Sequence, residues 1–203
     1  MQKLKRLAVP GILTLILCLF TFIVLPVRVK GTSMMNTIND GDFMFMTGVN
    51  RRTPIHRFDI VDIRSKTLKE DIIKRVIGLP GEEVSYKNDH LYINGNCIQE
   101  PFLKSSYITK QLKQYQLTQY TNDFKIKLKQ NEYFVLGDHR LVSYDSRHFG
   151  PIHKKDIRAK NGYIIYPIKN IKKVDEEKVW QNRFSGTQDI WPKPKEKSKI
   201  KLN

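Results

Sequence analysis

Two segments of the chain place a serine and a lysine where they could act as a nucleophile and its base. In VKGTSMMNTINDGD, Ser33 lies among Gly, Asn and Asp residues that predict turns. An isolated turn serine usually bonds its own backbone, and it becomes a nucleophile when a base removes its proton. In DIIKRVIGLPGEE, Lys74 lies inside an apolar, strand-like run, where burial would lower the pKa of its side chain from about 10.4. The alternative is that Lys74 points to solvent and pairs with a carboxylate.

A third segment, LGDHRLVSYDSRHFGPI, holds too many polar residues for an ordinary strand. Acidic and guanidinium groups can hold each other through paired hydrogen bonds, and Ser143 can offer an oxygen to a neighbouring lysine without adding a charge. The alternative is a polar surface loop with exposed ion pairs. His139 beside Asp138 also suggests a Ser/His/Asp triad, but adjacent residues on a strand point to opposite faces, which argues against it. The polar residues of this segment include Asp138, Arg140, Ser143, Asp145, Ser146 and Arg147.

The chain before Ser33 contains an uncharged apolar run, LAVPGILTLILCLFTFIVLPV, from Leu7 to Val27. As a helix this run would span about 30 Å, which matches the core of a bilayer, so it predicts a transmembrane helix. A cleaved signal peptide is the alternative, but no A-x-A-like site follows the run. Basic residues are more numerous before the run than directly after it, which favours a cytoplasmic N-terminus and places the remainder of the chain outside.

After this run, short stretches rich in Val, Ile, Tyr and Phe alternate with Gly, Pro, Asn and Asp, which is typical of strands. No helical apolar period is sustained after residue 30, so we expect a mainly β, antiparallel core. Residues 103–131 are polar and look inserted between two strand-rich blocks. The predicted strands are FDIVDI (58–63), IIKRVIGL (72–79), HLYING (90–95), EYFVLGD (132–138) and NGYIIYPI (161–168).

The chain is strongly basic, with 36 Lys and Arg residues against 20 Asp and Glu and a net charge of +16. Nucleic acid is the usual partner for such a charge, but the aromatic residues do not interleave with a basic stripe as stacking platforms would. Because a membrane segment is present, we expect anionic lipids as the partner and no nucleic acid. The C-terminal end has a lysine at every second position from Lys193 to Lys201, a composition typical of a mobile tail.

The cysteines and histidines give no sign of a disulfide or a metal site. Cys18 lies in the apolar run and Cys97 far along the chain, so a bridge would have to join the membrane interior to the globular domain. The histidines show no spacing typical of zinc ligands. We therefore expect no metal and no cofactor.

Four segments, in their order and spacing, resemble the successive conserved boxes of the bacterial type I signal peptidases (leader peptidases): GTSMMNTI, FDIV, KRVIGLPGE and GDHRLVSYDSRHFG. With one N-terminal anchor and this length, the chain is similar to the compact enzymes of Gram-positive bacteria. The resemblance implies a membrane-bound serine endopeptidase with a Ser/Lys dyad, which removes N-terminal signal peptides from exported proteins through an acyl-enzyme. It also implies small residues at the first and third positions before the cut.

Carried over by position, the resemblance makes Ser33 the nucleophile and Lys74 the general base, with Ser143 orienting the lysine. Asp145 and Arg147 match a supporting ion pair. The implied oxyanion hole uses the Ser33 backbone N–H, while a second donor sometimes found two residues earlier is absent because that position is glycine. The other residues assigned in this way are Asp138 and Arg75, in supporting roles, and Met34, in substrate binding.

Two positions depart from the family's pattern. Asn36 stands where the first box usually has proline, and His139 where the third box usually has asparagine or aspartate. Neither departure removes a catalytic atom. Losing the fixed φ of proline would loosen the turn after Ser33, so we expect Asn36→Pro to be tolerated or to raise activity.

The resemblance implies an antiparallel β-rich catalytic core with a small inserted cap region, on a single N-terminal transmembrane helix in the cell membrane. The alternative is a non-catalytic relative that binds pilin-like or other secreted clients during surface assembly, and the intact Ser33, Lys74 and Ser143 argue against it. The expected divisions are a cytoplasmic N-terminus (1–6), the membrane helix (7–27), the core (28–82 and 132–174), the cap (83–131) and a basic tail (175–203).

Overall fold

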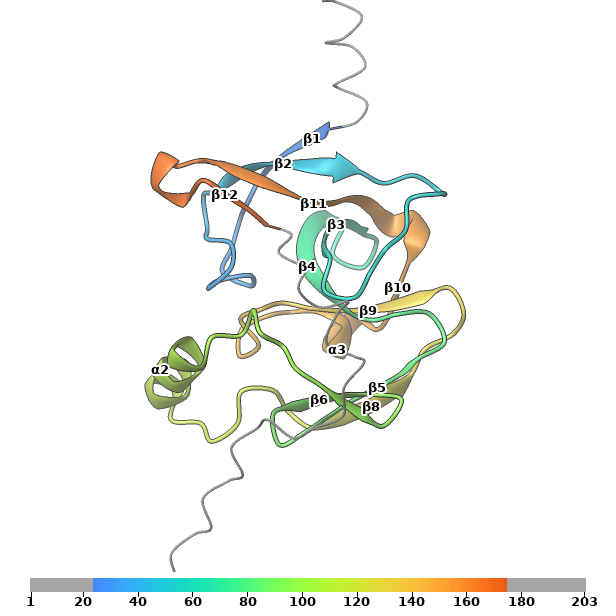
Figure 1. The fold of residues 1–203 in the computed structure, drawn as a ribbon, viewed down its shortest axis with the longest axis vertical. Coiled ribbons are helices and arrows are strands. Elements are labelled where there is room, and N and C mark those ends of the chain that lie inside the picture. The colour runs from blue at the N-terminus through green and yellow to red at the C-terminus, as the bar shows by residue number, and fades with distance from the viewer. Residues whose placement is uncertain (1–23, 175–203) are drawn as a thin grey trace, which may run out of the picture.

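The computed structural model describes residues 24–174, which form two antiparallel sheets and a few short helices (Figure 1). The expectation of a mainly β, antiparallel protein is confirmed. The larger sheet has eight strands and the smaller one has four. Each sheet contributes one side of the molecule, with the larger sheet in the upper part of Figure 1 and the smaller sheet in the lower part.

The larger sheet combines central strands that are buried along most of their length with outer strands that alternate buried and more exposed residues. In FMFMTG, for example, Met44 and Met46 are buried while Phe43 and Phe45 are partly exposed, as a period of two requires. Its order is β1-β2-β11-β3-β4-β9-β10, and β12 pairs with β11. The strands are β1 (Val24–Arg28), β2 (Phe43–Gly48), β3 (Ile60–Ser65), β4 (Glu70–Gly78), β9 (Glu132–Leu136), β10 (Ile152–His153), β11 (Ile157–Tyr166) and β12 (Lys172–Lys173).

The smaller sheet arises from chain inserted between β4 and β9. Two-residue turns join its first three strands, and their residues, Asn88 with Asp89 and Asn94 with Gly95, all have positive φ, as tight hairpins require. The order is β7-β6-β5-β8. Its strands are β5 (Glu83–Lys87), β6 (His90–Ile93), β7 (Asn96–Ile98) and β8 (Phe124–Lys127).

The inserted chain also contains a helix that the sequence pattern did not reveal. Helix α2 (Ser105–Tyr115) carries a short apolar stripe, Tyr107, Ile108, Leu112 and Tyr115, at helical spacing, but this stripe is only partly buried and lies among Lys and Gln residues, so it was not recognised in the sequence. It ends at Gln116, which adopts the left-handed conformation common at helix ends. The remaining helical turns are α3 (Ser146–Phe149), η1 (Lys154–Asp156) and η2 (Ile168–Asn170).

The end of the predicted membrane helix is different in the structure. Residues Val24–Arg28 form β1, which pairs with β2, so the last four residues of the expected helix 7–27 are strand. Pairing with β2 supplies partners for backbone groups that a helix would have bonded internally. Residues 7–23 and the predicted tail 175–203 lie outside the described residues. Between residues 24 and 174, no helix is both long and apolar enough to cross a membrane.

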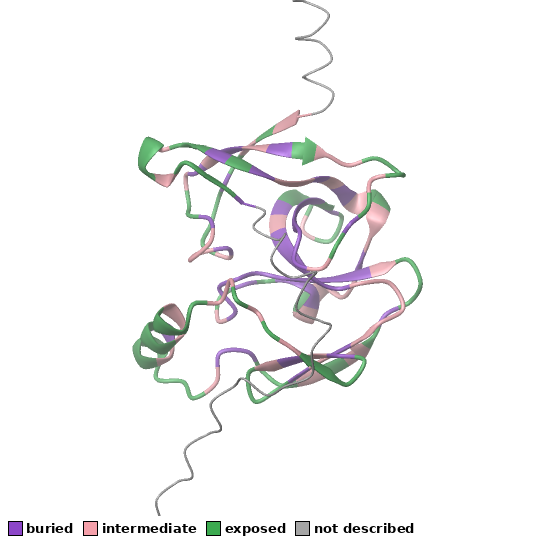
Figure 2. Cartoon of the chain, in the orientation of Figure 1, coloured by how far each residue is buried: buried purple, intermediate pink, exposed green. Residues whose placement is uncertain are grey.

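The core consists of three clusters of buried apolar residues, which Figure 2 shows in purple within the strands. Two clusters belong to the larger sheet, and the third joins the two sheets, for example through Val84, Leu91 and Phe134. The sheets meet closely at Gly78, where an added Cβ would lie 2.4 Å from a methyl carbon of Val84. The smaller sheet is therefore packed firmly against β4 and β9, the strands that lead into the candidate site.

One edge of β4 is open where the candidate site begins. On one side, β4 pairs with β3 along Glu70–Arg75. On the other side, its pairing with β9 begins at Arg75. Among the described residues, the segment Glu70–Lys74 thus has no strand partner on that second side. The backbone groups along this edge are placed to pair with an added strand.

Candidate active site

Ser33 lies in a compact turn between β1 and β2. The turn is closed by hydrogen bonds from Val29 N to Asp42 O (2.8 Å) and from Gly41 N to Val29 O (3.0 Å). Within it, Ile38 N donates to Met34 O at 2.9 Å. Ser33 remains partly exposed, and its backbone N–H donates no hydrogen bond to another described residue. A hydroxyl on this turn is accessible to a substrate, and the adjacent N–H is available as an oxyanion donor.

Lys74 points inward from β4 and contacts this serine. Its Nζ lies 2.8 Å from Ser33 Oγ, and it also donates to the Ile73 carbonyl at 3.1 Å. Lys74 is 4% exposed, so the alternative of a solvent-facing lysine is excluded. Burial lowers the pKa of its ammonium group from the usual 10.5 to about 8, against the opposing charges of three carboxylates, of which Asp145 has the largest effect. A substantial fraction of the lysine is therefore neutral in weakly alkaline solution.

Ser143 is buried beside this pair, at the point where Gly137 allows the chain to approach closely. A Cβ built on Gly137 would lie 2.2 Å from Ser143 Oγ and 2.5 Å from the Ser33 carbonyl oxygen. The structure shows no hydrogen bond between Ser143 Oγ and Lys74 Nζ. The Ser143 hydroxyl instead lies near Asp145 and helps to lower the pKa of that carboxyl, although it has no partner in hydrogen-bond geometry among residues 24–174.

Asp145 and Arg147 form a tight ion pair at the start of α3. Arg147 donates through Nε to Asp145 Oδ1 and through Nη2 to Oδ2, both at 2.8 Å. The Gly137 N–H donates to the same carboxylate at 3.1 Å. Burial alone would raise the pKa of Asp145, but the Arg147 guanidinium and the Gly137 N–H outweigh it and hold that pKa below its usual value. A fixed negative charge therefore lies behind Ser143.

Arg75 and Asp138 form a second, fully buried pair. Arg75 donates to the two carboxylate oxygens of Asp138 at 2.8 Å and 2.7 Å. The Thr37 hydroxyl donates to the same carboxylate, and Arg75 Nη1 donates to the Phe58 carbonyl at 3.0 Å. The pair thus joins β4, the turn after Ser33 and the loop after β9. Both the guanidinium and the carboxylate have further hydrogen-bond partners, so neither charge is buried unpaired.

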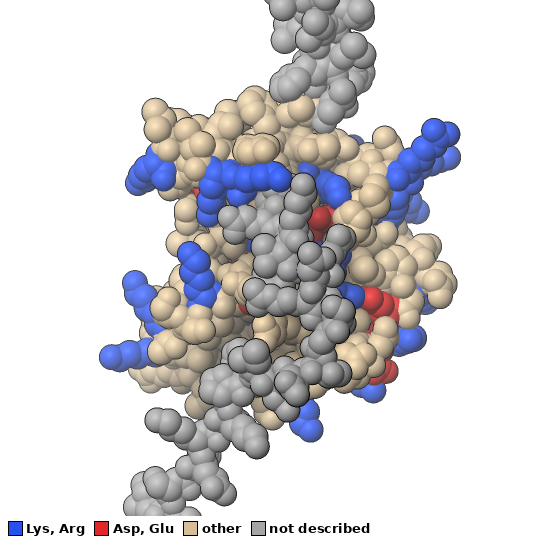
Figure 3. Space-filling view, in the orientation of Figure 1, with Lys and Arg blue, Asp and Glu red and all other residues tan. Residues whose placement is uncertain are grey.

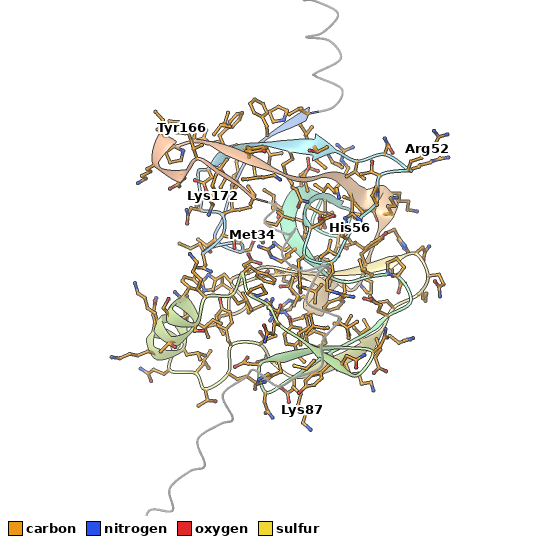
Figure 4. All side chains as sticks on the ribbon, in the orientation of Figure 1. Met34, Arg52, His56, Lys87, Tyr166 and Lys172 are labelled. Atoms are coloured by element: carbon orange, nitrogen blue, oxygen red, sulfur yellow. The ribbon has the colours of Figure 1, made fainter. Side chains whose placement is uncertain are left out.

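Met34 lies between the upper sheet and the lower part of the molecule, as Figure 4 shows. It is 2% exposed and belongs to the core cluster under β1 and β2. It also borders an open groove of about 590 Å³, whose two sides are formed by Pro26–Ser33 and by Glu70–Lys74. Val142 and Tyr144, which are 42% and 48% exposed, stand at the Ser33 end of this groove. Met34 can therefore contact a bound chain from beneath.

Sequence reasoning missed a buried network that anchors the loop after β9. Arg140, singled out in the sequence as one of several polar residues, donates to Glu100 at 2.5 Å and to the Tyr86 hydroxyl at 2.8 Å. Its side chain is fully buried. Glu100 and Tyr86 come from the inserted chain, and nothing in the sequence indicated that this chain contacts the loop after β9. The importance of Gly137 was likewise hidden, because it depends on contacts made only in the folded chain.

Asn36 adopts a backbone conformation that overturns the expectation for proline at this position. Its φ is +84°, in the left-handed region, whereas the proline ring fixes φ near −65°. Its side chain also donates from Nδ2 to the Phe102 carbonyl at 3.1 Å. Asparagine tolerates this conformation better than most residues. The prediction that Asn36→Pro is tolerated is therefore wrong for the turn as it folds here.

His139 is buried, but it is not on a strand, so the argument from opposite faces of a strand does not apply to it. Its backbone N–H donates to the Ser33 carbonyl at 3.0 Å. Neither ring nitrogen has a hydrogen-bond partner between residues 24 and 174. Burial lowers the pKa of His139, against a smaller opposing effect of the Thr32 backbone. The Ser33 hydroxyl is bonded by Lys74 and not by this imidazole, so a Ser/His/Asp triad is excluded.

Comparison with known proteins identifies the family to which the chain belongs. The family described as Signal peptidase, peptidase S26 matches residues 3–166. Signal peptidase I V of Bacillus subtilis (strain 168) is 43% identical over 139 residues, covering 64% of this chain and 79% of that protein. Signal peptidase I of Streptococcus pneumoniae serotype 4 is 36% identical over 173 residues, covering 71% of this chain and 83% of that protein.

Among solved structures, a crystal structure of a signal peptidase I from Enterococcus faecalis V583 is 34% identical. The match covers 53% of this chain and 97% of the Enterococcus faecalis chain, with a TM-score of 0.46. From the sequence matches, the chain belongs to the signal peptidase family, peptidase S26. Its activity is that of a type I signal peptidase, a serine protease that removes signal peptides from exported proteins.

Proposed function

We propose that Ser33 is the nucleophile of this peptidase and Lys74 its general base. The observation that carries the proposal is the 2.8 Å contact between Lys74 Nζ and Ser33 Oγ, made by a lysine whose pKa burial lowers to about 8. The protonated lysine donates in this contact. Once it has lost its proton, the nitrogen lone pair can accept the proton of the serine hydroxyl.

The reaction then proceeds in two stages. Ser33 Oγ attacks the scissile carbonyl carbon while Lys74 takes the hydroxyl proton, and the Ser33 N–H stabilises the oxyanion. The C–N bond breaks as Lys74 returns the proton to the leaving amine, which leaves an acyl-enzyme. Water, deprotonated by Lys74, attacks the ester carbonyl. The bond from that carbon to Ser33 Oγ breaks as Lys74 returns the proton to the serine oxygen, and the signal peptide leaves with a free carboxylate. The same nitrogen serves both stages because it borders both Ser33 and the groove.

We assign supporting roles to the residues around the pair. Ser143 limits where the Lys74 amine can move, and the Asp145–Arg147 pair holds the segment that carries Ser143. The Arg75–Asp138 pair fixes β4 one residue after Lys74. Each acts by holding the reacting groups within the narrow geometry that attack requires.

The substrate is proposed to lie extended in the groove and to add a strand to its open edges. The unpaired edge Glu70–Lys74 and the facing segment Pro26–Ser33 can supply backbone hydrogen bonds to such a chain. Alternate side chains of a bound strand point to opposite faces. The first and third residues before the cut would then face the floor together, which Met34 helps to line.

We further propose that the catalytic core sits on the outer side of the cell membrane, held by the apolar run that precedes β1. Support comes from an exposed apolar face at the end of the larger sheet, on the same sheet as β1. Tyr166 and Ile168 are 62% and 79% exposed there, and Figure 4 shows Tyr166 with Lys172 close by. Blue Lys and Arg side chains predominate over red Asp and Glu on the visible face in Figure 3. Tyrosines with nearby lysines suit the interface of an anionic membrane.

The finer divisions of the chain remain part of this proposal. They are the cytoplasmic residues 1–6, a core from 28–82 and 132–174, a cap from 83–131 and a basic tail from 175–203. The position of the smaller sheet, which runs from Glu83 to Lys127, supports the boundaries of the cap. The alternative of a protein that binds pilin-like clients without cutting them is not favoured, because the relatives carry peptidase names.

A panel of preproteins tests this function. The full-length protein in detergent would be incubated with preproteins from the same cell, and the new N-termini sequenced. We expect cuts after small residues at the first and third positions, and no cleavage by a folded Ser33→Ala variant. Retained cleavage by Ser33→Ala would refute the assigned nucleophile, and cuts without small residues would refute the assigned specificity.

A further inference from the structure

The inserted chain reaches the nucleophile's turn at a side-chain contact that the reaction scheme does not use. Asn36, three residues after Ser33, donates from Nδ2 to the carbonyl oxygen of Phe102 at 3.1 Å. Phe102 lies just before helix α2. The left-handed backbone of Asn36 directs its side chain toward the inserted chain rather than along the turn. One end of the turn that carries Ser33 is thus tied to the segment that leads into α2.

Helix α2 also contacts His139, the second residue that holds the turn of Ser33. The ring of Tyr107 meets the ring of His139 edge to face, with centroids 5.8 Å apart, and Tyr115 approaches the same ring at 6.4 Å. His139 in turn donates its backbone N–H to the Ser33 carbonyl at 3.0 Å. A line of contacts therefore runs from α2 through His139 to the backbone of the nucleophile.

This contact is one of ring packing. The two His139 ring nitrogens and the Tyr107 hydroxyl are buried without a hydrogen-bond partner in the part of the chain that the structure describes. Edge-to-face pairs contribute about 0.5–1.5 kcal/mol beyond the area that they bury. A phenyl ring in place of the imidazole should therefore preserve the contact.

The same inserted segment also holds the residue next to Lys74. The Arg75 guanidinium lies 3.9 Å above the centre of the Phe102 ring. Tyr120 donates its hydroxyl to the Asp138 carbonyl at 3.0 Å. The inserted chain thus contacts residues that hold Ser33 and residues that hold Lys74, although it supplies no group that could react.

We infer that the segment Phe102–Tyr115 positions the nucleophile, with Asn36 and His139 as the positioning residues through which it acts. The inference rests on the proposed role of Ser33. Ser33 stands on a partly exposed turn, so its alignment depends on what holds the turn at each end. A misplacement of 1 Å at a reacting atom can cost about 100-fold in rate. These are also the two positions at which the sequence departs from the family's boxes.

Matched variants at Asn36 test the first contact. Asn36→Gly keeps the left-handed backbone and removes the donor, and Asn36→Asp turns an oxygen toward the Phe102 carbonyl. We expect kcat on a signal-peptide substrate to fall on the order of 10-fold in both, with KM within about twofold and the unfolding temperature nearly unchanged. Unchanged kcat in both folded variants would overturn the role of Asn36.

A double-mutant cycle tests the second contact. His139→Ala and Tyr107→Ala should each lower kcat, and the double variant should fall little further than the worse single variant, because both remove one contact. His139→Phe should recover most of the activity that His139→Ala loses. Lys110→Ala, on the exposed side of α2, is the matched control and should keep wild-type kcat. Independent, additive losses would overturn the inference, as would losses that appear in KM or unfolding temperature alone.

The outcomes separate this inference from the proposed function. Activity in a folded Ser33→Ala variant would refute the nucleophile itself, whatever the other variants do. If Ser33 is required but the Asn36, His139 and Tyr107 variants keep wild-type kcat, the positioning role fails and the catalytic assignment stands. If His139→Ala does not fold, the Asn36 variants and the comparison of His139→Phe with Tyr107→Ala decide the question.

Discussion

The side-chain nitrogen of Lys74 and the hydroxyl oxygen of Ser33 lie 2.8 Å apart, although 41 residues separate them along the chain. The contact depends on antiparallel pairing between β3 and β4, which places Lys74 opposite Val61 on an apolar face. It also depends on the closed turn that presents Ser33 above that face. The burial that lowers the pKa of the lysine also holds it against the serine.

Asn36→Pro is expected to damage the enzyme. Proline cannot adopt the φ of +84° found here, so the turn that carries Ser33 would have to rearrange, at a cost of roughly 1–3 kcal/mol. Thermal unfolding measures the loss of stability, and the cleavage rate measures the loss of activity. Asn36→Gly, which accepts the same φ, is the control for the backbone. An Asn36→Pro protein with wild-type stability and activity would contradict the turn conformation.

Gly137→Ala is expected to abolish most activity. The new methyl group would collide with Ser143 Oγ and with the Ser33 carbonyl, so the loop must move away from the nucleophile. Gly95→Ala is the contrasting control, because Gly95 lies in the turn between β6 and β7, where an added carbon meets open space. The strain at this position comes from its positive φ alone. It should lower stability and leave the activity of folded molecules unchanged. Similar activity losses in both variants would contradict this prediction.

Breaking the Arg75–Asp138 pair is expected to cost far more stability than breaking a surface pair. Asp138→Ala leaves a buried guanidinium without its partner, a change of about 3–5 kcal/mol in the free energy of unfolding. Lys125→Ala removes an exposed pair with Glu83 and should change stability by about 0.5 kcal/mol or less. Denaturant unfolding of both variants gives the comparison. A loss under 1 kcal/mol for Asp138→Ala would show that the pair is dispensable.

The apolar face around Tyr166 is expected to bind membranes. Ile168→Glu places a negative charge on this face and should weaken binding of the protein to vesicles that contain anionic lipid. Leu117→Glu is the control, because Leu117 is also exposed but lies on the inserted chain beyond α2. Sedimentation with vesicles at low and high salt measures both. Equal binding by the two variants would show that the face has no part in membrane contact.

Much of this arrangement could be predicted from the sequence, and the remainder depends on contacts between distant segments. The apolar, strand-like run around Lys74 and the turn residues around Ser33 were visible locally, and the order of the four family-like boxes indicated that the two belong to one site. Helix α2 was missed because its apolar stripe is short, only partly buried and set among Lys and Gln residues. The left-handed φ of Asn36 and the close approach at Gly137 could not be predicted, since they arise from packing against Phe102 and Ser143.

The central claim is that neutral Lys74 is the base that takes the Ser33 proton. The most direct measurement is the cleavage rate of a signal-peptide substrate from pH 5 to pH 10, for wild type, Lys74→Ala, Glu70→Gln and His139→Ala. Because the pKa of Lys74 is lowered to about 8, wild-type activity should rise with pH through a limb centred near that value. Lys74→Ala should be inactive at every pH. The Glu70 carboxylate raises the pKa of Lys74, so Glu70→Gln should move the limb to lower pH. His139→Ala should keep the position of the limb at a lower plateau. A wild-type limb near 6.5 that disappears in His139→Ala, with Lys74→Ala still active, would contradict the account.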